Sequence, residues 1–187
     1  VWSRLVHDYM LGIRQPMTDL MAWNADATRM PYRMHSEYLR KLFLDNDLAE
    51  GHFEAGGEPV TLGDIRVPIF AVGTERDHVA PWRSTYKINL QAETAVTYLL
   101  TSGGHNAGIV SEPGHPRRSF RVHTKENGSH YLDPERFLTQ APKDGSWWPE
   151  WAAWLGDHSG APTSPPPMGA SHLPPLGDAP GTYVFQQ

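Results

Sequence analysis

Two short apolar runs in the middle of the chain constrain its fold more than any other feature. Residues 67–73 (VPIFAVG) and 95–100 (AVTYLL) are rich in β-branched and aromatic side chains and are bounded by turn-forming residues, as buried strands are. Between them, Pro81 suits the first turn of a helix over residues 82–90. The order strand, helix, strand predicts a βαβ unit with parallel strands and a right-handed connection.

The flanking segments predict helices and one further strand. Residues 1–55 carry apolar side chains at helical spacing and contain no convincing strand, and residues 51–66 are turn material. Phe120 and Val122 alternate with polar residues, which predicts a short, half-exposed strand or sheet edge. Helices are expected at residues 134–140 and 149–155, and an irregular tail rich in proline and glycine over residues 159–187. The fold class is therefore α/β.

Composition excludes several classes of function. The chain of 187 residues has 21 acidic and 16 basic residues and a formal charge of −5, which argues against a nucleic-acid partner. It has no cysteine, so disulfides, thiolate zinc sites and a cysteine nucleophile within these residues are excluded. The longest apolar stretch is far shorter than the ~20 residues of a transmembrane helix, and no signal-peptide pattern opens the sequence.

The residues that point to chemistry are Asp77 and His105. Each follows one of the two predicted strands, and about one helix and one strand separate them in the sequence. Open α/β sheets place their active sites at the carboxyl ends of such strands. An acid followed by a histidine in this order is typical of the last two members of an α/β-hydrolase triad, in which the acid orients the imidazole and the imidazole takes the proton of the nucleophile.

The nucleophile of such a triad is missing from this sequence. Neither Gly-x-Ser-x-Gly nor Gly-x-Cys-x-Gly occurs, and the segment before Asp77 is short and helical in character. The first residue is Val1 instead of Met, which suggests a fragment or a processed product. We therefore expect the part that bears the nucleophile to lie outside this chain.

Other candidate residues have simpler interpretations. His78 is expected to pack or hydrogen-bond locally, although it could line a pocket. The tryptophans at 147, 148, 151 and 154 have helical spacing and are expected in the core. Glu75 and Asp77 lack further ligands at metal-binding spacing, so no metal site is predicted.

Five separated motifs resemble the polyhydroxyalkanoate synthases, also called poly-beta-hydroxybutyrate polymerases. TERDHVAPW at 74–82 and LTSGGHNAGIV at 100–110 resemble the family's aspartate and histidine loops. WNADATR at 23–29 resembles the segment before its last catalytic strands. GSWWPEW at 145–151 and GTYV at 181–184 resemble the ending of its single-subunit class for short-chain substrates.

The resemblance implies an α/β-hydrolase core with a helical cap. Residues 1–55 would be the end of the cap, 56–158 the C-terminal part of the core and 159–187 a tail. The family joins (R)-3-hydroxyacyl-CoA thioesters into a polyester and releases CoA. Its nucleophile is a cysteine, which His105 would activate, while Asp77 would activate the 3-hydroxyl of the incoming monomer. CoA enters as part of the substrate, and no cofactor is implied.

The resemblance also implies a setting for the parent enzyme. It is expected in the cytoplasm at the surface of polyester granules, as a homodimer. The partners of this chain would be the missing N-terminal part of the synthase, (R)-3-hydroxyacyl-CoA and the growing polyester. Two alternatives stay open. The chain could be a fragment of a serine α/β-hydrolase or polyester depolymerase, or a non-catalytic binding module. A Gly-x-Cys-x-Gly upstream of Val1 would favour the synthase, and Gly-x-Ser-x-Gly the hydrolase.

Overall fold

The computed structural model describes residues 6–13, 21, 23, 25, 29–178 and 181. The chain divides into two compact units, which we describe separately. The N-terminal unit comprises Val1–Arg66 with Gln91–Glu93, and the sheet unit comprises Val67–Leu90 with Thr94–Gln187. Most of the WNADATR motif at 23–29 and all but the first residue of GTYV at 181–184 lie outside the described residues.

The described residues of the N-terminal unit form several short helices and one hairpin. It contains the π-helix η1 (Val6–Met10), α3 (Tyr32–Tyr38), the π-helix η2 (Leu39–Leu44), α4 (Asp47–Glu50) and the 3-10 helix η3 (Leu62–Asp64). The expectation of no strand within residues 1–55 is wrong, because β1 (Phe53–Ala55) pairs antiparallel with β2 (Glu58–Val60). Gly56 and Gly57 both have positive φ, as a two-residue hairpin turn requires, so this turn material closes a hairpin.

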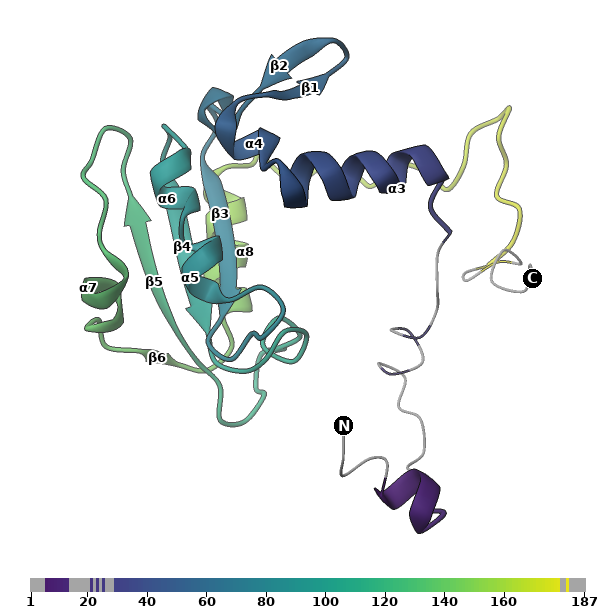
Figure 1. Ribbon diagram of the computed structural model, residues 1–187, viewed down its shortest axis with the longest axis horizontal. Coiled ribbons are helices and arrows are strands. Elements are labelled where there is room, and N and C mark those ends of the chain that lie inside the picture. Colours follow the sequence, from purple (N-terminus) through teal and green to yellow (C-terminus); the bar gives the residue numbers. More distant parts are fainter. Residues whose placement is uncertain are drawn as a thin grey trace. The chain divides into compact units, whose positions relative to one another are not determined.

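The sheet unit contains a four-stranded sheet in the order β3-β4-β5-β6 (Figure 1). β3 (Ile69–Thr74) and β4 (Val96–Thr101) are parallel, as the βαβ pattern predicts. β5 (Ser119–Lys125) and β6 (Lys143–Asp144) continue the sheet antiparallel. The short, half-exposed strand predicted at Phe120 and Val122 is confirmed as β5, and β6 pairs only with its first two residues, Ser119 and Phe120. The helix expected over residues 82–90 forms as two short helices, α5 (Trp82–Thr85) and α6 (Ile88–Gln91).

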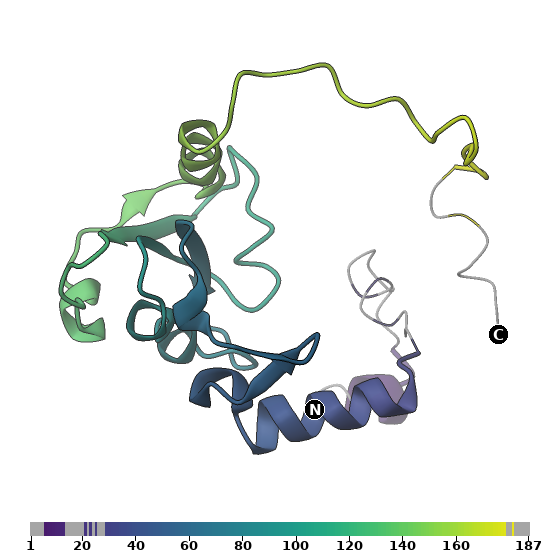
Figure 2. The ribbon, with the colours of Figure 1, turned by 90° about the horizontal axis from the view of Figure 1, so that it is seen from above.

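Two apolar clusters cover the two faces of the sheet because successive side chains of a strand point to opposite sides. Tyr98 and Leu100 of β4 pack with Tyr86 and with Phe137 of α7 (Pro134–Leu138). On the other face, Leu99 and Phe120 pack with Trp147, next to α8 (Trp148–Asp157). Figure 2 shows α8 on one side of the sheet and the short helices α5 to α7 on the other. The sheet unit is thus a three-layer α/β structure.

The tryptophans only partly follow the core prediction. Trp147 is 5% exposed, and Trp148 and Trp154 are half-buried, but Trp151 is 42% exposed. Beyond α8, the described part of the tail has no helix or strand, and its one bridge joins Ala170 to Leu173. Among the described residues, no helix combines the length and the apolar character needed to cross a membrane.

Candidate functional site

The register of β3 and β4 brings two loops to the same edge of the sheet. Thr74 pairs with Thr101, so the two parallel strands end level with each other. The loops that follow are linked by backbone hydrogen bonds. The amide of Glu75 donates to the carbonyl of Thr101 at 2.9 Å, and the amide of Arg76 donates to the carbonyl of Gly103 at 2.9 Å. Asp77 and His105 lie just beyond these linked positions.

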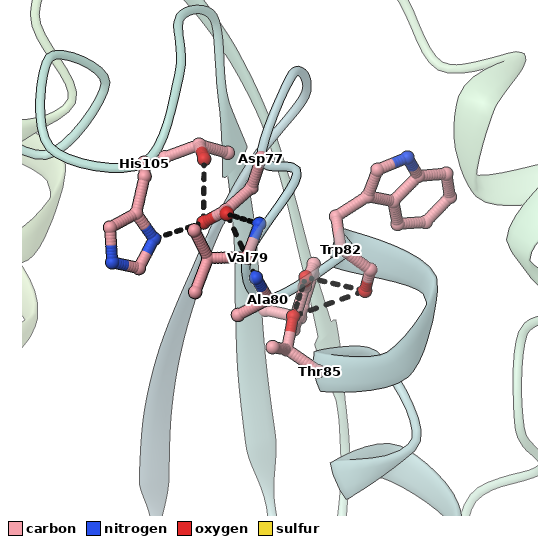
Figure 3. A network of polar contacts seen from close by, with 8 residues as sticks. Asp77, Val79, Ala80, Trp82, Thr85 and His105 are labelled. Atoms are coloured by element: carbon pink, nitrogen blue, oxygen red, sulfur yellow. Dashed lines mark hydrogen bonds and ion pairs between the residues drawn. The ribbon is translucent and has the colours of Figure 1, made fainter. Parts of the chain in front are cut away.

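The structure brings Asp77 and His105 into direct contact. His105 Nδ1 lies 2.8 Å from Asp77 Oδ2 (Figure 3). Because a carboxylate can only accept, Nδ1–H is the donor, and Nε2 of the neutral imidazole keeps a free lone pair. The Asp77 side chain is 8% exposed and the His105 side chain is 45% exposed. The pair therefore presents an accessible basic nitrogen backed by a nearly buried carboxylate.

The Asp77 carboxylate is held by its own loop. Its Oδ1 accepts hydrogen bonds from the amides of Val79 and Ala80, both at 2.9 Å. Its Oδ2 accepts a weaker bond from Thr74 Oγ1 at 3.3 Å. The Ala80 amide, followed by the His105 and Val79 hydrogen bonds, holds the pKa of Asp77 well below its usual range against the opposing effect of burial. The carboxylate is thus ionised at neutral pH.

Two glycines give the His105 loop its path. Gly103 has φ +116, a conformation that side chains rarely allow. Gly108 packs so closely on Thr74 that an added Cβ would lie 2.6 Å from Thr74 Cγ2. The loop closes with a hydrogen bond from the Gly108 amide to the Gly104 carbonyl at 2.8 Å. Close packing at both glycines fixes the backbone that carries His105.

The remaining candidates lie apart from this contact. Glu75 Oε1 pairs with Arg121 Nη1 of β5 at 2.8 Å. His78 is exposed. Within the part of the chain that the structure describes, no three His, Asp or Glu side chains form a group able to hold a metal ion.

Sequence reasoning missed the groups that support the pair. The amides of Val79 and Ala80 were foreseeable, because an aspartate commonly accepts from backbone amides two and three residues later in a turn. Nothing in the local pattern identified Thr74. The hydrogen bonds that Trp147 and Trp148 donate to the His105 loop were also missed, because helical spacing pointed only to the core.

Known proteins with similar sequences were found for the whole chain. A poly(3-hydroxyalkanoate) polymerase of Methylorubrum extorquens is 40% identical over 187 residues, covering 98% of this chain and 30% of that protein. Poly(3-hydroxyalkanoate) polymerase 2 of Ectopseudomonas oleovorans is 33% identical over 99% of this chain. Poly(3-hydroxyalkanoate) polymerase subunit PhaC of Cupriavidus necator is 34% identical over 98% of this chain. No protein-family model matches the chain.

The alignments cover nearly the whole of this chain but only about a third of each relative. The covered shares are 30%, 33% and 31% of the lengths of these three relatives. Identity of 33–40% across so many residues indicates common descent and a common fold for the shared part. By descent, this chain is homologous over its whole length to a portion of the poly(3-hydroxyalkanoate) polymerases.

Proposed function

We propose that this chain is the C-terminal catalytic segment of a polyester synthase. The synthase would polymerise (R)-3-hydroxyacyl-CoA into polyhydroxyalkanoate with release of CoA, and this segment would supply Asp77 and His105 of a Cys-His-Asp triad. The observation that carries the proposal is the 2.8 Å contact between His105 Nδ1 and Asp77 Oδ2 at the carboxyl edge of β3 and β4. Homology to polymerases supports the substrate class.

In the first step His105 acts as a general base. Its Nε2 takes the proton of a cysteine thiol, since a free thiol with pKa ~8.5 is mostly protonated at neutral pH. The thiolate attacks the carbonyl carbon of the acyl-CoA thioester, the bond to the CoA sulfur breaks, and the leaving thiolate takes the proton from the imidazolium. Asp77 stabilises that imidazolium through the Nδ1 hydrogen bond. The exchange replaces one thioester by another and is nearly balanced in free energy.

In the second step the Asp77–His105 pair activates a hydroxyl group. The 3-hydroxyl of a hydroxyacyl unit gives its proton to Nε2, and its oxygen attacks the enzyme-bound thioester. An ester bond forms, the bond to the enzyme sulfur breaks, and the proton returns to that sulfur. The ionised state of Asp77 supports this role, because a negative charge behind the imidazole stabilises its protonated form.

The proposal assigns the rest of the chain by the same homology. Residues 1–55 would end the helical cap, 56–158 would be the last part of an α/β-hydrolase core and 159–187 a tail. The parallel β3–β4 pair with helices on both faces is consistent with that core. These 187 residues hold no cysteine, so the nucleophile must come from elsewhere and the chain alone should be inactive. The site of action would be the granule surface in the cytoplasm.

The test uses the complete gene product, meaning the protein encoded by the whole open reading frame in which this chain occurs. It is mixed with labelled 3-hydroxybutyryl-CoA, and covalent protein label and CoA release are followed. His105→Ala should slow labelling by about 10²–10⁴-fold, the usual contribution of a general base. His130→Ala is the matched control, because His130 is an exposed histidine outside the two site loops.

Three outcomes would count against the proposal. Unchanged labelling in His105→Ala would remove the role of the histidine. Label on a serine would favour the hydrolase or depolymerase alternative. CoA release by the 187-residue chain alone, lost on His105→Ala, would show that no external cysteine is needed.

A further inference from the structure

The loop that carries His105 is held by residues 145–148, the segment that leads into helix α8 and begins it. The indole Nε1 of Trp147 donates to the carbonyl of Gly108 at 3.1 Å. The indole Nε1 of Trp148 donates to the carbonyl of Ile109 at 2.9 Å. The hydroxyl of Ser146 donates to the carbonyl of Ser111. Three successive side chains thus bind three backbone carbonyls within one short stretch of the loop.

The donor segment is itself anchored in the sheet unit. Its first residue, Gly145, donates its amide to the carbonyl of Arg118 at 2.7 Å, directly after β6 pairs with β5. Trp147 is buried with Leu99 and Phe120 in one of the two apolar clusters. The Ser146 hydroxyl also accepts the amide of Trp148 at 3.1 Å, which ties the segment to the first turn of α8. The tryptophan N–H groups therefore project from a rigid base.

His105 needs such support because its own side chain provides little. The imidazole is 45% exposed, and its Nδ1 is hydrogen-bonded to Asp77. The start of the loop is held where Arg76 donates to the carbonyl of Gly103. The end of the loop is held by Trp147 and Trp148. His105 lies between these two attachments, which hold the backbone from which its imidazole reaches Asp77.

We propose that Trp147 and Trp148 are positioning residues for His105. Their indole N–H groups hold the carbonyls of Gly108 and Ile109 and thereby keep Nε2 in the place where it receives the proton of the nucleophile. This inference rests on the proposed function, because it assigns the tryptophans a role in the same proton transfer. Misplacement of a reacting group by about 1 Å can cost ~10²-fold in rate. Loss of the two hydrogen bonds that hold the loop could therefore slow proton transfer measurably.

The main variant is Trp148→Phe in the complete gene product. Trp148 is half-buried, so the change removes the N–H donor with less loss of core packing than at Trp147. Trp154→Phe is the matched control, because Trp154 lies on the same helix but packs on Phe70 and His158. Trp147→Phe tests the second bond. Replacement of Trp148 by benzothienylalanine keeps the ring shape, exchanges N–H for sulfur and guards against a folding defect.

Two measurements separate positioning from folding. Amide hydrogen exchange in a peptide spanning residues 104–112 reports the loop, whose Gly108, Ile109 and Val110 amides are hydrogen-bonded within it. Single-turnover acylation by 3-hydroxybutyryl-CoA reports proton transfer, and its concentration dependence gives the apparent KM. We expect faster exchange at 104–112 and a 10- to 100-fold slower acylation with unchanged KM in Trp148→Phe and the benzothienylalanine variant. Trp154→Phe should match the wild type in both.

The results distinguish this inference from the proposed function. Unchanged exchange at 104–112 in the benzothienylalanine variant would show that the indole N–H does not hold the loop, whatever the activity. Faster exchange with unchanged acylation would show a structural role only, and would overturn positioning while leaving the proposed function intact. A wild-type protein that is not acylated would overturn the proposed function and with it the role of the tryptophans in proton transfer. The exchange data would still show whether the two indole hydrogen bonds hold the loop.

Discussion

His105 Nδ1 lies 2.8 Å from Asp77 Oδ2, and the two residues reach this contact from loops that follow different strands. The contact depends on the level ends of β3 and β4 and on the backbone hydrogen bonds that join the two loops. It leaves Nε2 as the free basic nitrogen.

Asp77→Asn should separate the two proposed chemical steps in the complete gene product. The amide keeps the shape of the carboxylate but loses the charge that stabilises a protonated imidazole. We expect covalent labelling by 3-hydroxybutyryl-CoA to slow but persist, because a thiol with pKa ~8.5 gives up its proton more readily than a hydroxyl, while chain growth stalls; His105→Ala should lose both. Label and polymer length are measured separately over time. Equal loss of label in the two variants would mean that Asp77 serves only to orient His105.

The stability of the chain should depend on pH through Asp77. Its pKa in the folded state is lowered, whereas its unfolded value is near 3.9, so its contribution is fully present above about pH 4. The contribution is lost as pH falls from there toward the folded pKa. Urea unfolding between pH 3 and 7 should show a steeper acid loss for the wild type than for Asp77→Asn. Asp178→Asn in the exposed tail should follow the wild type, and identical profiles for all three would contradict the prediction.

Gly108→Ala should impair the site without changing the reacting groups. The new Cβ would lie 2.6 Å from Thr74 Cγ2, so Thr74 or the His105 loop must move. We expect acylation to slow by up to about 10²-fold, because Thr74 is hydrogen-bonded to Asp77 and the loop carries His105. Gly156→Ala is the control, because its added Cβ meets no atom within 4 Å. Wild-type acylation rates in Gly108→Ala would show that the loop tolerates the displacement.

Phe137→Ala should destabilise the sheet unit. Phe137 is fully buried and packs against Tyr86, Tyr98 and Leu100. Removing a buried phenylalanine side chain typically costs about 3–5 kcal/mol in the free energy of unfolding. Urea denaturation monitored by circular dichroism gives the value. Leu176→Ala, at a fully exposed position in the tail, should stay within about 0.5 kcal/mol of the wild type, and a similar result for Phe137→Ala would contradict the packing described here.

Local patterns predicted the elements that carry the site. The apolar runs at 67–73 and 95–100 indicated β3 and β4, and the polar residues after them indicated Asp77 and His105. Such signals are local because burial, strand alternation and turn formation depend on neighbouring residues. The same reasoning failed for the hairpin of β1 and β2. A short strand is stable only through its partner, and pairing leaves little trace in its own sequence.

By itself the sequence determined the order of elements around the candidate site, the choice of Asp77 and His105 as candidate residues, and the absence of a cysteine from these residues. Only the tertiary structure decided that Thr74 pairs with Thr101, that Thr74 reaches Asp77, and that Trp147 and Trp148 bind the His105 loop. The physical reason is the nature of the partners. Both tryptophans donate to backbone carbonyls far away in the sequence. Since every residue has a backbone carbonyl, the residue types at the accepting positions could not predict these contacts.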